Sequence, residues 1–431
     1  NNWNEGLKHP VFSDVSKRAG ILYEGYGLGV NVVDINNDGW KDIYVSNDYI
    51  SNNLLYLNNH DGTFTNNAYK TFKHTSRNAM GNDIADINND GLVDVIELDM
   101  SPQDNYRIKM MYTINSYNFV RKMNEMGYMQ QNIHNSLQLN QGNRISINDS
   151  IGQPIFSEVS YFSGVAQTDW SWAPLLIDVD NDGFRDLMIT NGLPKDVTDL
   201  DFMAYRESSN AKTPISEVIK RIPSLKLANF IYKNNGDITF TDKTLDWGWQ
   251  TPTFSSGMAY ADFDADGDID VVVNNTNMEA SLLENTANET QSDSTNYIRV
   301  KLKGGANNIN GIGAKLNLYY AGNKQQVYEC NPYRGYLSSV ENIAHFGLGK
   351  TTHSIVVQWP DLKRQTLSNI KSNQTIVVDI NASKQSPASN LSAAVTKNWF
   401  TDVTHLTGIN FVSTETEFVD FNVQRLLPHK L

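Results

Sequence analysis

Hydrophobic and polar residues alternate along most of the first 290 residues, in runs that are too short for ordinary helices. Apolar, glycine-punctuated runs read GLGVNVV, GNDIA, APLLI and GMAYA. Each is followed, after a polar segment, by a second run: IYVSND, VIELDM, LMITNG or VVVNN. Short runs of this kind, rich in β-branched residues and bounded by Gly and Asn, are typical of β-strands. The pattern predicts an all-β fold of short strands joined by turns.

The polar segment between the paired runs occurs four times. It has the form D-x-[DN]-x-D-G-x-x-D and reads DINNDGWKD, DINNDGLVD, DVDNDGFRD and DFDADGDID. Each copy begins 22 residues after a phenylalanine of a preceding strand, namely Phe12, Phe64, Phe156 and Phe240. Four identical offsets identify a true internal repeat.

Two insertions interrupt the repeat, near residues 103–132 and 198–226, and have a different period. The first spaces Ile108, Met111, Tyr112, Phe119, Met123 and Met126 at roughly helical intervals, and the second carries Pro214 followed by SEVIKRI. Both are predicted to be helical. Met-rich helices either form adaptable binding surfaces or pack on their own blade, and packing is the favoured interpretation.

The repeated loop supplies the oxygen atoms that a hard cation needs. Ca²⁺ takes about 6 to 8 oxygen ligands. With loop positions numbered 1 to 9, positions 1, 3, 5 and 9 offer side-chain oxygens and position 7 offers its main-chain carbonyl. The predicted ligands are Asp34, Asn36, Asp38, Trp40 and Asp42; Asp86, Asn88, Asp90, Leu92 and Asp94; Asp178, Asp180, Asp182, Phe184 and Asp186; and Asp262, Asp264, Asp266, Asp268 and Asp270. The sequence therefore predicts about four Ca²⁺ sites.

Two other interpretations of the loop are weaker. Asp, Asn and Gly are also common in metal-free turns, but three or four carboxylates in one loop repel each other without a counter-ion. The second copy, with Glu97 at its twelfth position, also fits the EF-hand loop. The other copies have Val45, Ile189 and Val273 there, and strand-like runs flank all four. Glu97 is accordingly expected to face solvent.

Composition narrows the class of function. The net charge is −13, but 14 of the 48 acidic residues are predicted loop ligands, so four Ca²⁺ would bring the charge to −5. No basic face is available for nucleic acid. The single cysteine, Cys330, excludes an intrachain disulfide framework. No run approaches the roughly 18 apolar residues of a membrane span.

The loops resemble those of the FG-GAP/VCBS repeat family over roughly residues 10–285. Support comes from NLLYLNNHDGTF and TDWSWAPLLIDVDNDGFRDLMITNG. Members of this family include the integrin α-chain propeller and many bacterial surface proteins. The resemblance implies that residues 1–290 form blades of a β-propeller, commonly of about seven blades, with one Ca²⁺ hairpin in each.

Residues 295–381 are similar to the ASPIC/UnbV domain, which follows such repeats in other proteins. The residues that carry the similarity are Gly311, Gly313, Arg334, Gly335, His345 to Gly349, Trp359, Pro360 and Gln365. Leu362 departs from the family pattern, which has Gly after WPD. The alternating strands predict a small β-sandwich or barrel. Arg334 and His345 are candidates for a functional role there, although a structural role in the fold is the favoured interpretation.

A linker is expected over residues 382–397, and residues 398–431 open a further FG-GAP repeat at WFTDV. No calcium loop follows this opening before Leu431. The chain is therefore expected to be a fragment of a longer protein.

The functional expectation is a non-catalytic binding protein. No Gly-rich phosphate loop or nucleophile elbow is present, and the eight histidines are scattered. The resemblance implies an extracellular or cell-surface location, at a bacterial outer membrane and lipid-anchored through a segment outside this chain. Ca²⁺ is millimolar outside the cell, and this concentration is high enough to fill repeated loops that each bind Ca²⁺ with weak affinity. Some such proteins accompany outer-membrane nutrient importers, which implies a protein partner, a glycan partner or both.

The alternative is a polysaccharide lyase or hydrolase on a calcium-binding propeller. The aromatic pairs Trp170/Trp172 and Trp247/Trp249 are candidates for stacking on sugars, although alternation within a blade favours core packing.

Overall fold

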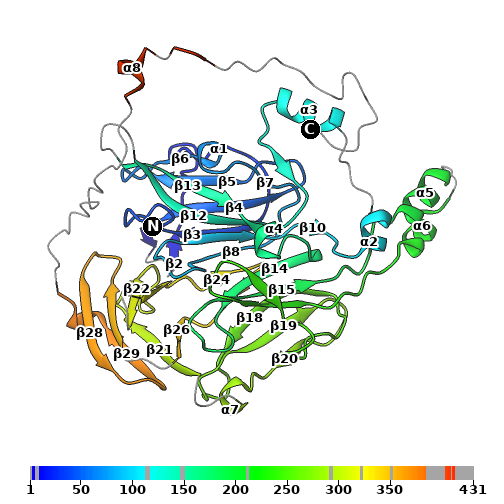
Figure 1. Cartoon of the computed structure of the whole chain (residues 1–431). Helices are drawn as coiled ribbons and strands as arrows, with labels where there is room; N and C mark the ends of the chain where they lie inside the picture. The colour runs from blue at the N-terminus through cyan, green and yellow to red at the C-terminus, as the bar shows by residue number, and fades with distance from the viewer. Residues whose placement is uncertain are drawn as a thin grey trace. The chain divides into compact units, whose positions relative to one another are not determined.

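The computed structural model describes residues 2–4, 9–111, 117–145, 151–209, 213–290, 295–320, 324–349, 353–384, 403–408 and 410–412. The chain divides into two compact units, residues 1–386 and 387–431. The first unit is built mainly of antiparallel strands (Figure 1). In the second, the described residues include one short helix, α8 (Thr404–Thr407).

Four antiparallel sheets, here called blades 1 to 4, follow one another along the chain. Blade 1 contains β3 (Tyr26–Val33), β4 (Asp42–Asp48), β5 (Leu54–Asn58) and β6 (Phe64–Asn66). Blade 2 contains β8 (Asn82–Ala85), β9 (Asp94–Glu97), β12 (Ser136–Ile145) and β13 (Ile151–Glu158). Blade 3 contains β10 (Met100–Ser101), β14 (Asp169–Ile177), β15 (Asp186–Asn191), β16 (Phe230–Asn234) and β17 (Phe240–Asp242). Blade 4 contains β18 (Ser255–Ala261), β19 (Asp270–Asn275) and β20 (Ser281–Leu283).

Two two-stranded sheets and several short helices complete the N-terminal part of the first unit. β1 (Asn2–Asn4) pairs with β2 (His9–Val11), and β7 (Thr75–Ser76) pairs in parallel with β11 (Gln131–Asn132). The short helices are α1 (Ala68–Thr71), α4 (Ser160–Ser163) and α7 (Ala287–Thr290).

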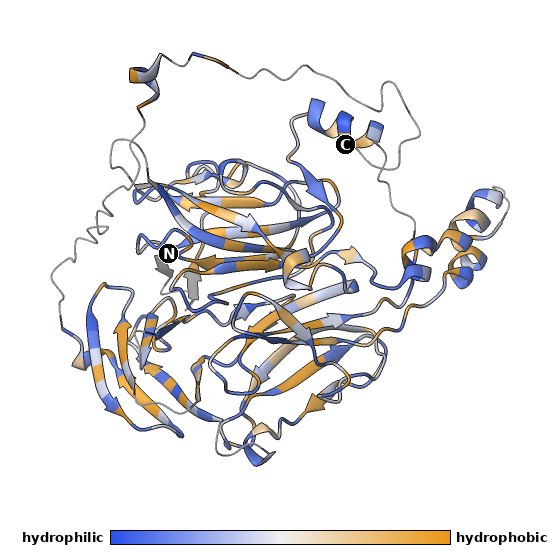
Figure 2. Cartoon of the chain, viewed as in Figure 1, coloured by the Kyte–Doolittle hydropathy of each residue, from blue (hydrophilic) through white to orange (hydrophobic). Residues whose placement is uncertain are grey.

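The core lies between neighbouring blades. One apolar cluster joins blades 1 and 2, a second joins blades 2 and 3, and a third joins blades 3 and 4. Figure 2 shows hydrophobic colour concentrated along the strands and polar colour in the loops. Of the four repeated phenylalanines, Phe156 and Phe240 are buried, whereas Phe12 is 76% exposed. Facing sheets of neighbouring blades therefore bury apolar side chains against each other, whereas Val30 and Val32 on β3 of blade 1 are exposed.

The two insertions are helical, which confirms that prediction. The first forms α2 (Asn105–Met110) and α3 (Tyr117–Glu125), and the second forms α5 (Leu200–Ser208) and α6 (Ile215–Arg221). Asp104 and Asp199 cap α2 and α5 by accepting from Arg107 and Phe202 N–H. Tyr112 lies outside the described residues. The insertions contact each other through a β-bridge between Met111 and Asp199. Arg107 of α2 also pairs with Asp169 of β14 and with Asp196, which precedes the second insertion.

A two-sheet β-sandwich follows blade 4. One sheet contains β26 (Ile343–Gly349), β21 (Asn296–Lys303) and β29 (Gln374–Asp379). The other contains β23 (Lys324–Glu329), β22 (Lys315–Tyr320), β27 (His353–Gln358) and β28 (Arg364–Ile370), and the turn η1 (Ile380–Ala382) follows β29. Both sheets enclose one core around Trp359 and Phe346. Leu362 adopts φ 65°, so this turn keeps the left-handed conformation that glycine favours.

A hairpin of the C-terminal domain, β24 (Tyr333–Arg334) and β25 (Ser338–Ser339), lies among the blades. β24 lies against β3 and β8, and β25 lies against β18. The buried Arg334 guanidinium donates to both carboxylate oxygens of Asp83 (2.7 and 2.5 Å), to Leu176 O (2.9 Å) and to Tyr260 Oη (2.9 Å). Arg334 therefore joins β8 of blade 2, β14 of blade 3 and β18 of blade 4, and is structural.

The described residues form four blades, with the β24–β25 hairpin bridging blades 1 and 4, and they do not show a closed propeller ring. One expectation needs correction. Glu97 does not face solvent. It is fully buried and accepts from Tyr44 Oη (2.7 Å) and Ser76 N–H (2.8 Å). The alternation of residues along β9 could not reveal that neighbouring blades cover both faces of this strand. The predicted repeat over residues 398–431 lies mostly outside the described residues.

Candidate metal centres

Each predicted calcium loop is the tip of a hairpin of its blade: β3–β4 in blade 1, β8–β9 in blade 2, β14–β15 in blade 3 and β18–β19 in blade 4. The position 1 aspartate directly follows the first strand, and the position 9 aspartate begins the second strand, in all four copies. The loops are bounded by strands rather than helices, which excludes the EF-hand unit. The registered pairing of the two strands fixes positions 1 and 9 close together in every loop.

Two residues of each loop have positive φ. The glycine at position 6 has φ between 91° and 99°, as the pattern predicts (Gly39, Gly91, Gly183 and Gly267). Position 4 is also left-handed: φ is 59° at Asn37, 59° at Asn89, 56° at Asn181 and 65° at Ala265. Asn adopts this conformation at a lower cost than Ala does. The repeat of Asn at position 4 is thus explained by backbone geometry.

The position 1 carboxylate organises the loop backbone in three copies. Asp34 accepts from the N–H groups of Asp38 (3.0 Å) and Gly39 (2.9 Å). Asp86 and Asp178 accept from the corresponding positions 5 and 6. In all four loops the position 5 carboxylate accepts from the N–H of position 7, at 2.8 to 3.0 Å. These bonds hold the position 7 residues, whose carbonyls are the predicted fifth ligands.

The position 9 aspartates are buried and identically bonded. One oxygen accepts from the N–H of position 2 and the other from the N–H of an asparagine in β5, β12 or β16 or just after β20, at 2.8 to 3.0 Å. The latter donors are Asn58, Asn140, Asn234 and Asn285. A carboxylate oxygen has two lone pairs, so each can accept an N–H and still bind a cation.

These four asparagines were not identified from the sequence. Each side-chain amide donates to the carbonyl of loop position 8 in its own blade. Asn140, Asn234 and Asn285 also donate to the position 2 carbonyl of the preceding blade's loop, at 3.2, 2.8 and 2.8 Å. They therefore tie each loop to the next blade. Their signal in the sequence is an asparagine in or shortly after the strand that follows each loop hairpin: Asn58 and Asn234 end β5 and β16, Asn140 lies within β12, and Asn285 lies two residues after β20.

Burial raises the pKa of several carboxyls at positions 1 and 9 of the loops. The pKa of Asp86 is raised to about 6 and that of Asp42 to about 7, with burial as the main cause. Burial and then the neighbouring loop carboxylates raise the pKa of Asp178 well above its usual range. Carboxylates held together in this way are stabilised by a bound cation.

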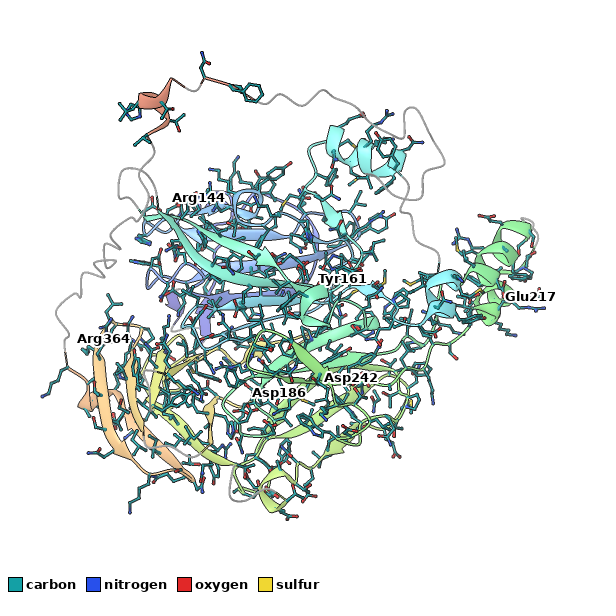
Figure 3. All side chains as sticks on the ribbon, in the orientation of Figure 1. Arg144, Tyr161, Asp186, Glu217, Asp242 and Arg364 are labelled. Carbon is teal, nitrogen blue, oxygen red and sulfur yellow. The ribbon has the colours of Figure 1, made fainter. Side chains whose placement is uncertain are left out.

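Buried carboxylate oxygens that lack a hydrogen-bond donor test whether the loops suit Ca²⁺. In loops 3 and 4, Asp180 Oδ1 and Asp262 Oδ1 are buried and accept no hydrogen bond within the described residues. Carboxylate oxygens lie within 4.8 Å of one another in two separate groups. One group is Asp178, Asp180 and Asp186 of loop 3, and the other is Asp262, Asp264 and Asp270 of loop 4. Figure 3 shows Asp186 within blade 3. An oxygen-only donor set of this kind fits Ca²⁺. Ligation by the residues named above remains a prediction.

Two of the loops carry a competing side-chain cation. Lys233 of β16 donates to Asp180 and, at 2.6 Å, to Asp182, which are positions 3 and 5 of loop 3. Arg299 of β21 pairs with Asp262, position 1 of loop 4. Loops 1 and 2 have no Lys or Arg bonded to a predicted ligand side chain in the described part of the chain. The four sites are therefore not electrostatically equivalent.

The C-terminal domain contacts every calcium loop. Lys315 donates to Asn37 Oδ1 (2.6 Å) and Gln325 donates to Asp90 O (2.9 Å). His345 Nε2 lies 2.6 Å from Asn181 Oδ1, and Arg299 pairs with Asp262. Burial lowers the pKa of His345 to about 3, so the ring is neutral and structural, as expected.

The tryptophan pairs are mainly core residues. Trp170 and Trp249 are buried, Trp172 donates to Gly192 O (2.8 Å) and Trp247 packs on the blade 3–4 cluster. Exposed aromatic residues within the loops include Trp40, which is 47% exposed and stacks on His60 at 4.8 Å, and Phe263 of loop 4. The sequence pattern singled out Trp40 only for its carbonyl.

Two family models match the chain. An FG-GAP-like repeat matches residues 34–96, and the model described as ASPIC and UnbV matches residues 304–385. The chain contains an FG-GAP-like repeat and an ASPIC/UnbV domain. It is also distantly similar to cartilage acidic protein 1 of Mus musculus, at 24% identity over 371 residues, and of Xenopus tropicalis, at 26% over 375 residues. These alignments cover 85% and 86% of this chain but 47% of each relative, so the chain spans about half their length.

Two solved structures show weak likeness. An Agrocybe aegerita lectin that recognises non-reducing terminal N-acetylglucosamine aligns at 14% identity and TM-score 0.25, over 59% of this chain and 52% of the lectin. The V. cholerae biofilm matrix protein Bap1 aligns at 11% identity and TM-score 0.23, over 81% and 60%. At these scores neither likeness establishes a common fold. Separately, the described helices include none with the length and apolar character of a membrane span.

Proposed function

We propose that the protein is a non-catalytic, extracellular or cell-surface binding protein whose Ca²⁺-stabilised blades present a polar surface to a glycan. The observation that carries this proposal is an open cavity of about 440 Å³ beside calcium loop 1. Its lining is formed by Asn36, Asp38, Leu57, Asn58, Asn59, His60, Thr65, Asn67, Lys70, Asn143 and Gln153.

The chemistry of this cavity suits sugar hydroxyls. Six of the eleven lining residues are Asn or Gln, whose amides both donate and accept hydrogen bonds, and Leu57 is the single aliphatic one. His60 joins the cavity to the exposed Trp40, and an indole of this kind offers an apolar face to a pyranose ring. A lipid or an apolar peptide finds little matching surface here.

The cavity shares residues with the metal centre. Asn36 and Asp38 are predicted ligands of loop 1, and His60 Nε2 lies 2.9 Å from Asp38 Oδ2. Calcium would fix both side chains, so glycan binding is expected to depend on Ca²⁺. A protein partner, including an outer-membrane nutrient importer, would bind elsewhere on the blades or insertions.

The test is a glycan array followed by calorimetry, with Ca²⁺ and with EGTA. Wild type is expected to bind at least one glycan only with Ca²⁺, and Trp40→Ala and Gln153→Ala are expected to weaken binding. Tyr106→Ala serves as a control, since Tyr106 is 68% exposed on α2, outside the cavity. Equal binding by all variants would refute this site, and calcium-dependent depolymerisation of a glycan would favour a lyase or hydrolase.

A further inference from the structure

Three metal-ligating side chains that belong to no calcium loop meet beside blade 2. His74 directly precedes β7, His134 follows β11 and Glu158 ends β13. One ring nitrogen of each histidine and one carboxylate oxygen of Glu158 lie within 4.8 Å of one another. The parallel pairing of β7 with β11 and the attachment of β13 to β12 bring these distant segments together.

His134 is held in a metal-binding tautomer. Its Nδ1 lies 2.6 Å from the carbonyl oxygen of Asn135, so Nδ1 carries the proton and donates. In the neutral ring, Nε2 then has a free lone pair. Metal-bound histidines characteristically donate their other ring N–H to a backbone carbonyl or carboxylate, which fixes the ring orientation.

Glu158 and His74 also have unused ligand atoms. Glu158 Oε1 accepts from Ser160 N–H (2.8 Å) and Leu137 N–H (3.2 Å), which fixes the carboxylate. Its Oε2 lies 3.9 Å from His74 Nε2, beyond hydrogen-bond length. His74 Nδ1 is buried and has no hydrogen-bond partner among the described residues. Hydrogen bonding between the side chains therefore does not explain why these groups are gathered.

We propose that His74, His134 and Glu158 form a binding site for a divalent transition metal of the Zn²⁺ class. Two imidazoles and a carboxylate suit Zn²⁺ and its neighbours, whereas Ca²⁺ prefers oxygen alone. Ligands at about 2.1 Å from a tetrahedral Zn²⁺ lie about 3.4 Å apart. The observed separations, at most 4.8 Å, need side-chain movements of about 1 Å to reach that geometry.

The site would have an open coordination position. Ser76 Oγ donates to His134 O (2.9 Å) and Gln138 donates to His74 O (2.9 Å), so the backbone at both histidines is held. The Tyr161 ring packs on His134 at 4.9 Å and is 63% exposed (Figure 3), so the buried His134 lies directly beneath a surface side chain, and His74 and Glu158 are partly buried beside it. Three protein ligands leave a fourth position for water or for an external oxygen or nitrogen ligand. This proposal is independent of the glycan proposal.

The test uses the full chain in saturating Ca²⁺, with Zn²⁺ counted per chain after gel filtration. Wild type is expected to retain one Zn²⁺. Glu158→Gln, which keeps an oxygen for the two backbone donors, and His74→Gln are expected to lower Zn²⁺ affinity about 100-fold or more. His405→Gln is the matched control, because His405 is exposed in α8, and should bind as wild type does.

Three results would overturn the proposal. These are no retained Zn²⁺ in wild type, Zn²⁺ displaced by excess Ca²⁺, and equal Zn²⁺ binding by wild type, Glu158→Gln and His74→Gln. Zn X-ray absorption of the wild-type protein keeps the test valid if a variant fails to fold. Scattering from two imidazoles supports the site, and a sulfur ligand from Cys330 contradicts it.

Discussion

Arg334 is predicted to hold the blades and the ASPIC/UnbV domain together, and Arg334→Met tests this role. The guanidinium makes four hydrogen bonds, and Asp83, its ionic partner, is fully buried. Removing one partner of a buried ion pair typically costs about 3–5 kcal/mol, because the remaining charge is left uncompensated. Asp83 also accepts from Ile84 N–H (2.9 Å) and Leu176 N–H (2.7 Å), which still stabilise the carboxylate. The expected loss of unfolding free energy is therefore about 3 kcal/mol.

The assay is guanidinium unfolding in saturating Ca²⁺, followed by tryptophan fluorescence. Trp359 reports on the ASPIC/UnbV core and Trp170 and Trp249 report on the blades. Asp83→Asn keeps an acceptor for the backbone donors, so Asp83→Asn/Arg334→Met should cost less than the sum of the two single variants. Arg121→Met is the control, since Arg121 is exposed and its pair with Glu125 is worth about 0.5 kcal/mol. A cost below about 1 kcal/mol for Arg334→Met, or strict additivity, would refute a structural role.

Three further substitutions test the local geometry, each by its change in thermal unfolding in Ca²⁺. Ala265→Asn should stabilise loop 4 by about 1 kcal/mol, because φ at this position is 65° and Asn tolerates it; a lower melting temperature would contradict this. Leu362→Gly should likewise stabilise the exposed turn after Trp359 by up to about 1 kcal/mol, whereas Leu362→Val should destabilise it. Asn234→Ala should cost about 2–3 kcal/mol, since the buried carbonyls of Ile87 and Arg185 lose their donor; an unchanged melt would show that this asparagine does not tie blades 2 and 3.

The sequence was sufficient for features that depend on local spacing. The strands on both sides of each loop follow from alternation, the positive φ at position 6 follows from Gly39 and its counterparts, and the insertions show helical period. Leu362, which departs from the family's glycine, has the φ that glycine would adopt.

Features that depend on contacts between distant segments were not predictable. Asn140 bonds to Ile35, 105 residues away, and Arg334 bonds to Asp83, 251 residues away. Lys233 approaches loop 3 only because β16 pairs with β15. His74, His134 and Glu158 show no ligand spacing in the sequence, since strand pairing alone gathers them. Glu97 was misplaced for a related reason, because burial of a second strand face depends on the neighbouring blade.

The central claim is that the four hairpin loops are calcium sites. Calorimetric titration of the chelator-treated chain with Ca²⁺, with Asp38→Asn/Asp90→Asn as a variant impaired in loops 1 and 2, measures this directly. We predict about four Ca²⁺ per wild-type chain, with the sites of loops 3 and 4 weaker because Lys233 and Arg299 compete there. The variant should lose the tighter sites. The absence of calcium binding by wild type, or an unchanged stoichiometry and affinity in the variant, would contradict the account.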